Sequence, residues 1–168
     1  QGGRLRRRST LALAGMSSPS PLDSLQMPPA LACEFFAAFS RFEFALKESG
    51  HFYVNRYGRA APDWDRFAAI ATLQAPAGSE LALAIDFLNR EPPQVQTSAH
   101  SWDPVPLRGA APIATALDAA QRVRHNLFHG GKHTPHSPPG RDEALVRAAL
   151  AVQLACVAQN PGVGAAYA

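Results

Sequence analysis

Apolar side chains recur at spacings of three and four residues along most of the chain, and this period constrains the fold more than any other feature. No segment alternates apolar and polar residues for long enough to form a sheet, so the sequence predicts an all-α protein. The clearest case is a first helix over residues 29–49, which follows two prolines and ends at Gly50. Its apolar stripe, expected to pack in the core, consists of Leu31, Phe35, Phe36, Phe39, Phe42 and Leu46.

Four further helices follow from the same period and from start and stop signals. A proline followed by acids at residues 62–65 starts a second helix, and Ser79 caps a short third helix. Two long helices are expected over about residues 111–129 and 141–159, after a loop over residues 92–109 that has no sustained period. The predicted architecture is an antiparallel bundle of four or five helices.

One helical domain is expected between two unstructured ends. Residues 1–28 have the composition of a disordered or upstream segment, in which Met16 can serve as a start. The domain is predicted over residues 29–160, and residues 161–168 are expected to fray. No stretch approaches the ~20 apolar residues of a membrane span, and the apolar run at residues 11–14 is too short for a secretory signal. A cytoplasmic protein without a membrane partner is therefore expected.

The chain is basic overall, with a net charge of +3, but the excess lies at one end. Four of the 16 basic residues precede Met16 and all 13 acidic residues follow it, so the rest of the chain carries 12 minus 13, or −1. A nucleic-acid partner must therefore be argued from local clustering. Cys33 and Cys156 lie far apart in apolar stretches, which fits neither a zinc box nor a disulfide framework and predicts two reduced core residues.

Local clustering is found over residues 122–136, which contain three basic residues, four histidines and no acid. At about 100° per residue, Arg124 lies about 50° from the buried direction of its helix, and His129 points nearly opposite to it. His129 is therefore expected outside the core. It also lies in the last turn, where the helix dipole favours a protonated imidazole.

Within this stretch, residues 124–129 (RHNLFH) resemble the signature of HEPN domains, an arginine followed after four to six residues by a histidine. HEPN domains are all-helical domains of prokaryotic toxins and defence ribonucleases. Residues 35–43 and 62–65 are also similar to an uncharacterised bacterial HEPN-like group, and the resemblance covers roughly residues 31–159. It implies metal-independent RNA cleavage, in which the 2′-hydroxyl attacks the adjacent phosphorus and leaves a cyclic phosphate and a free 5′-hydroxyl.

The resemblance also implies roles for individual residues. Arg124 would hold the phosphate, His129 would transfer a proton, and Asn126 would orient one of them by a hydrogen bond. No cofactor and no metal are expected. Further contacts to RNA or phosphate are predicted for four neighbours, Arg122, His125, Lys132 and His133.

A homodimer is predicted, because Arg124 and His129 are about 140° apart on an ideal helix and one chain is not expected to present both to one phosphate. HEPN domains pair so that two motifs face one cleft, which would give a composite site on one RNA strand. The irregular residues 92–109 are expected near the rim of this cleft.

Two alternatives stay open for the motif residues. Arg124 can instead form a salt bridge to Glu43 or another acid of the first helix. The histidines can instead bind a metal, although the two glycines at residues 130–131 interrupt their helix and no carboxylate lies close in sequence. The histidines of this alternative site are His125, His129, His133 and His136.

Two classes of function follow. The first is a metal-independent endoribonuclease, a toxin or a phage-defence or stress effector that is inactive until released from an antitoxin. The second is a noncatalytic HEPN-like module for dimerisation or for nucleotide or RNA binding, partnered with a nucleotidyltransferase or an antitoxin. A helical domain with one basic patch fits both classes.

Overall fold

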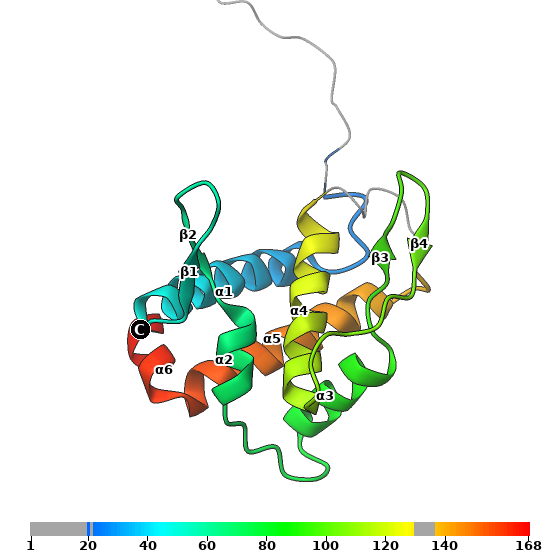
Figure 1. Ribbon diagram of the computed structural model, residues 1–168. Coiled ribbons are helices and arrows are strands. Elements are labelled where there is room, and N and C mark those ends of the chain that lie inside the picture. The colour runs from blue at the N-terminus through cyan, green and yellow to red at the C-terminus, as the bar shows by residue number, and fades with distance from the viewer. Residues whose placement is uncertain (1–19, 21, 130–136) are drawn as a thin grey trace, which may run out of the picture.

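The computed structural model describes residue 20, residues 22–129 and residues 137–168, and within these ranges the chain is mostly helical (Figure 1). The predicted helical character is confirmed, but these ranges hold six helices and two short antiparallel hairpins rather than four or five helices alone. A helix able to span a membrane is absent from the same ranges. The elements in chain order are α1 (Pro29–Glu48), β1 (Phe52–Val54), β2 (Ala60–Pro62), α2 (Trp64–Ile70), α3 (Glu80–Arg90), β3 (Val95–Gln96), β4 (Trp102–Asp103), α4 (Pro112–Phe128), α5 (Arg141–Gln159) and α6 (Pro161–Tyr167).

The core forms around α5, which packs against α1, α3, α4 and α6. In Figure 1, α4 crosses in front of α5. Val146, Ala149, Val152 and Cys156 of α5 are each no more than 1% exposed. At 100° per residue these four share one face of the helix, and the other buried residues widen that face to about 200° of its circumference. With four helices packed against it, α5 is the central element of the fold.

The aromatic residues of α1 form most of the core wall that faces α2. Phe35, Phe39 and Phe42 are buried as predicted, and the rings of Phe39 and Phe42 each lie 5.2 Å from the ring of Trp64. Phe36, however, is 55% exposed, so its predicted place in the core is wrong. The reason is its position about 100° round the helix from Phe35.

The two cysteines lie in different surroundings. Cys156 is fully buried on α5, and burial raises the pKa of its thiol to about 12. Cys33 on α1 is exposed, so the prediction of a second core cysteine is wrong. Cys33 precedes the buried Phe35 by two residues, about 200° round the helix, which turns it toward solvent.

The predicted starts of two shorter helices are confirmed by side-chain caps. At the start of α2, the carboxylate of Asp63 accepts a hydrogen bond from the backbone nitrogen of Arg66 at 3.0 Å. At the start of α3, Ser79 Oγ accepts one from the backbone nitrogen of Ala82 at 3.2 Å. Each cap satisfies a backbone donor that has no partner within its own helix.

The sequence predicts neither hairpin. β1 pairs with β2, and β3 pairs with β4 inside the loop predicted over residues 92–109. Strands of two or three residues are too short to show an alternating pattern, which is why they were not expected. In Figure 1 both hairpins project from the helical body on the side where α4 ends.

The predicted unstructured ends also need correction. Residues 161–167 form α6, which packs against α1 and α5 instead of fraying. Val163 anchors it in the core at 2% exposure, and Arg41 Nε of α1 donates to the carbonyl oxygen of Tyr167 at 2.7 Å. Before α1, Met27 is buried as well, so the expected disordered segment ends earlier than predicted. In both places one apolar side chain that reaches the core orders an otherwise weakly patterned segment.

Two glycines of α6 provide a matched test of its packing. A Cβ atom at Gly164 would lie 2.8 Å from the carbonyl oxygen of Val157, whereas nothing lies within 4 Å of a Cβ atom at Gly162. We expect Gly164→Ala to lower the free energy of unfolding by about 1–3 kcal/mol through this clash. Gly162→Ala should raise it by up to about 1 kcal/mol through helix propensity. Urea unfolding measures both, and equal effects would contradict the packing of α6.

Candidate functional site

A contact between Arg124 and His129 is the centre of the candidate site. Arg124 lies near the end of α4, and His129 is the residue at which that helix stops. The Nη1 atom of Arg124 lies 2.9 Å from the Nε2 atom of His129. Since a guanidinium only donates, Nε2 of His129 accepts this hydrogen bond, and its ring proton is assigned to Nδ1. One chain thus presents a cation and an imidazole side by side.

This contact corrects the expectation that one chain keeps Arg124 and His129 apart. The separation of about 140° assumed an ideal helix. His129 has φ −107° and ψ 30°, so its backbone has left helical geometry. The arginine side chain is also long enough to reach round the helix end. A second chain is therefore not needed to bring Arg124 and His129 together. The homodimer stays a prediction, but the separation of these two residues no longer supports it.

His125 adds a second imidazole one turn before His129. The centroids of the two rings are 4.4 Å apart, and the ring planes are inclined by 31°. Burial lowers the pKa of His125 from its ordinary value of 6.5, and the neighbouring His129 and Arg124 lower it further. His125 is therefore mainly neutral near pH 7.

The side chain of Arg124 is supported by an aromatic ring. Its guanidinium carbon lies 5.6 Å from the centroid of the Phe39 ring, a cation–π arrangement. The alternative salt bridge to Glu43 does not form, and none of the carboxylates in the described ranges pairs with Arg124. Its positive charge is therefore available to an anion such as phosphate.

A groove of about 350 Å³ lies along α4 beside Arg124, and we call it the α4 groove. Arg124 and His125 line it, together with Phe39 beneath the guanidinium. Val95 and Arg108 line it as well, so residues 92–109 lie next to the candidate site as predicted. The α4 groove thus gives a ligand access to Arg124 from the side of this loop.

Asn126 does not reach the Arg124–His129 pair. Its side chain is buried, and Nδ2 donates to the carbonyl oxygen of Gln94 at 2.7 Å. The bond ties the segment before β3 to α4. The predicted role of Asn126, orienting the histidine or the phosphate, is therefore corrected to a structural one. Its position three residues after the buried Val123 explains this, since both lie on the inner face of α4.

Arg122 is likewise occupied within the protein. Its side chain is only 13% exposed and pairs with Asp118, one turn earlier, at 2.8 Å. Its two terminal nitrogens donate to the carbonyl oxygens of Val105 and Pro106 at 2.5 and 2.6 Å. The predicted phosphate contact by Arg122 is therefore wrong, because the guanidinium is used to hold the loop.

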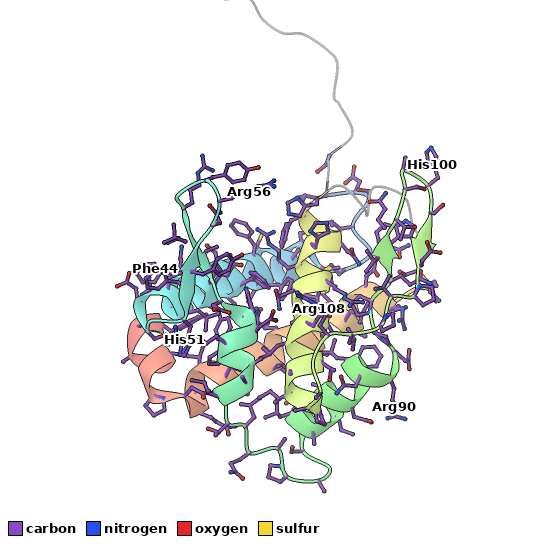
Figure 2. The ribbon with its side chains drawn as sticks, viewed as in Figure 1. Phe44, His51, Arg56, Arg90, His100 and Arg108 are labelled. Carbon is purple, nitrogen blue, oxygen red and sulfur yellow. The ribbon has the colours of Figure 1, made fainter. Side chains whose placement is uncertain are left out.

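Asp118 is the organising residue that the sequence prediction missed. Its side chain is 6% exposed and accepts hydrogen bonds from the Nε and backbone nitrogen of Arg108 at 2.7 and 3.1 Å. Arg108 is thereby held against α4 (Figure 2). A signal was available, because Asp118 is the only acid between Asp103 and Asp142 and precedes Arg122 by four residues.

Lys132, His133 and His136 lie outside the described residues. Among the residues that are described, no three of His, Cys, Asp and Glu are arranged to hold a metal ion. Of the alternative metal site, the described ranges contain His125 and His129.

No family model, curated protein or solved structure matches the chain. Membership of the HEPN family therefore stays a prediction from residues 124–129.

The buried carboxylate of Asp118 should matter for stability. We expect Asp118→Asn to lower the free energy of unfolding by about 3 kcal/mol, because it leaves the nearly buried guanidinium of Arg122 without its ion partner. Asp86→Asn is the matched control, since Asp86 and Arg90 form an exposed pair four residues apart, and its effect on stability should be far smaller. Thermal and urea unfolding compare the two, and similar losses would contradict the organising role of Asp118.

Titration of His125 tests the crowding of the two imidazoles. By NMR we expect its pKa below 6.5, and His129→Gln should raise the value by removing a like charge, although burial, the largest cause, remains. Because the folded pKa is below the unfolded one, the folded state binds fewer protons, and stability falls as the pH drops through 6.5. His100→Gln, at an exposed position between β3 and β4, is the control. A pKa of His125 at or above 6.5 would contradict the described surroundings.

Proposed function

We propose that the protein is a metal-independent endoribonuclease of the HEPN type, in which Arg124 and His129 act on one phosphodiester of RNA with His125 beside them. The observation that carries the proposal is the 2.9 Å contact between Arg124 and His129. It is supported by the lack of a carboxylate partner for Arg124 within the described ranges and by the α4 groove next to it.

RNA carries its own nucleophile, the 2′-hydroxyl, so cleavage requires proton transfer and charge stabilisation rather than an activated water. A base must take the 2′ proton, the leaving 5′-oxygen must receive one, and positive charge must balance the phosphate as it becomes five-coordinate. An imidazole fits the proton transfers near neutral pH. A guanidinium fits the third role, because its planar N–H groups bind two phosphate oxygens at once.

The contact between Arg124 and His129 gives an order to these events. When phosphate binds, Arg124 turns from Nε2 of His129 to a phosphate oxygen, and Nε2 is free to take the 2′ proton. The 2′-oxygen bonds to phosphorus, the bond from phosphorus to the 5′-oxygen breaks, and protonated His129 supplies the proton that the 5′-oxygen needs. The lowered pKa keeps His125 neutral, so a protonated His129 ring beside it is not opposed by a second charge.

In its biological setting we propose a cytoplasmic toxin or a phage-defence or stress effector, controlled by an antitoxin. The competing hypothesis is a noncatalytic module partnered with a nucleotidyltransferase. That hypothesis requires binding of RNA or nucleotide without cleavage, so an assay on the purified chain separates the two.

Cleavage of RNA by the purified protein is the direct test. We expect activity to persist in excess EDTA, to fail when the scissile nucleotide carries deoxyribose, and to leave a cyclic phosphate end. His129→Ala should reduce the rate by about 10² to 10⁴, the usual contribution of a positioned proton-transfer group. Arg124→Ala should also abolish cleavage, because no other described guanidinium contacts His129. Gel electrophoresis of end-labelled RNA gives the rates.

His100→Ala is the matched control, because it removes an exposed histidine from the β3–β4 hairpin and should leave the rate unchanged. Circular dichroism must show that each variant is folded. Full activity of His129→Ala, or loss of activity in EDTA, would overturn the proposed chemistry. An RNA-binding protein that never cleaves would favour the noncatalytic module.

A further inference from the structure

The hairpin formed by β1 and β2 projects from the helical body and is ordered by hydrogen bonds at both of its ends. At its base, the backbone nitrogen of Asp63 donates to the carbonyl oxygen of His51 at 2.9 Å. At its tip, the side chain of Asn55 accepts hydrogen bonds from the backbone nitrogens of Tyr57 and Arg59 at 2.9 and 3.1 Å. Gly58 completes the turn at φ +72°, where a residue with a side chain would be strained. The hairpin therefore presents its side chains from a defined backbone.

Those side chains are apolar and uncovered. Tyr53 is 52% exposed and Tyr57 is 69% exposed. The residues opposite β1 are Pro62, Ala61 and Ala60, which are too small to cover the aromatic rings. Large exposed apolar groups on an ordered hairpin mark an interaction surface. Its exposed apolar members are Phe52, Tyr53, Val54 and Tyr57.

The charge of the hairpin identifies the kind of partner. Arg56 and Arg59 lie in its turn, and no acidic residue occurs between Glu48 and Asp63. Within the described ranges neither guanidinium forms an ion pair. The guanidinium carbon of Arg56 lies 4.7 Å from the ring centroid of Tyr57, at the tip of the hairpin (Figure 2). Aromatic faces next to unpaired arginines suit a ligand with flat rings and phosphates.

We propose that the β1–β2 hairpin is a binding platform for single-stranded RNA, on which bases stack against Tyr53 and Tyr57 while Arg56 and Arg59 contact phosphates. Stacking on aromatic side chains combined with arginine contacts to the backbone is how proteins hold single strands without reading sequence. A duplex does not fit this surface, because its bases are already stacked on one another. The choice of RNA over DNA rests on the proposed function.

The β1–β2 hairpin lies on the same side of the molecule as the candidate site, so one RNA strand could contact both. In Figure 1 the hairpin projects from the same side of the helical body as the end of α4, where Arg124 and His129 lie. A strand held on the hairpin would therefore extend along that side. The platform would raise the affinity for substrate without taking part in proton transfer.

Binding of a probe that cannot be cleaved tests the platform separately from catalysis. The probe is a short, fluorescein-labelled single strand of 2′-O-methyl RNA, which lacks the attacking hydroxyl, and fluorescence anisotropy gives its Kd. We expect Tyr53→Ala and Tyr57→Ala each to weaken binding about tenfold, within the range of one lost base stack. Tyr57→Phe keeps the ring and should bind like the unmodified protein. Leu83→Ala, which removes an equally exposed apolar side chain on α3, should leave Kd unchanged.

The arginines give a second signature, the dependence of binding on salt. Each phosphate contact to a single strand contributes a slope of about 0.7 in a plot of log K against log salt concentration. Arg56→Gln combined with Arg59→Gln should therefore reduce this slope by about 1.4. A duplex made from the same probe should bind more weakly than the single strand.

The proposal is overturned if the tyrosine variants bind the probe as tightly as Leu83→Ala, or if the single strand and the duplex bind equally. It is also overturned if the tyrosine variants change only the oligomeric state in light scattering, which would assign the hairpin to a second copy of the chain. Failure of the proposed catalysis would be a separate result. If His129→Ala cleaved RNA at the full rate, the proposed chemistry would be overturned, but the affinity of the platform for the uncleavable probe would not change.

Discussion

The buried carboxylate of Asp118 joins the irregular part of the molecule to its helices. Arg108 and Arg122 converge on it, and Arg122 also holds two carbonyl oxygens of the loop. A carboxylate taken out of water is costly unless such partners are in place, so this loop and α4 must come together in one arrangement. The α4 groove lies between them, and its shape depends on an ion network separate from the Arg124–His129 pair.

Elements with several turns could be predicted from the sequence, because each turn repeats the apolar pattern. The expected helices over residues 29–49 and 141–159 agree with α1 and α5 within one residue at each end. The hairpins could not be predicted, because strands of two or three residues are too short to show an alternating pattern. The last helix, α6, could not be predicted because its order comes from packing against α1, far away along the chain. Val163 is one valine in a stretch of small residues, and only its place in the core shows why the segment is helical.

The two central residues of the candidate site, Arg124 and His129, could be predicted from the sequence, but their geometry could not. An ideal helix places Arg124 and His129 on different sides, because it extends helical geometry through His129. In the structure the backbone of His129 has already left helical geometry. The polarity of Asn126 and Arg122 predicts contacts to the substrate, yet burial decides what these side chains do. The spacing from Val123 to Asn126 and from Asp118 to Arg122 puts both side chains in contact with other parts of the protein rather than with a ligand.

Cys33 is exposed and Cys156 is buried, so alkylation of the second thiol measures how often the folded chain opens. The thiolate is the reactive form of cysteine, so the exposed Cys33 can be alkylated in the folded protein, whereas Cys156 is protected by burial and by a thiol pKa of about 12. A second alkylation therefore counts molecules in which the end of α5 that carries Cys156 has opened. Because Cys156 lies in the last turn of α5, next to α6, that event is at least the opening of the C-terminal end of the helical body.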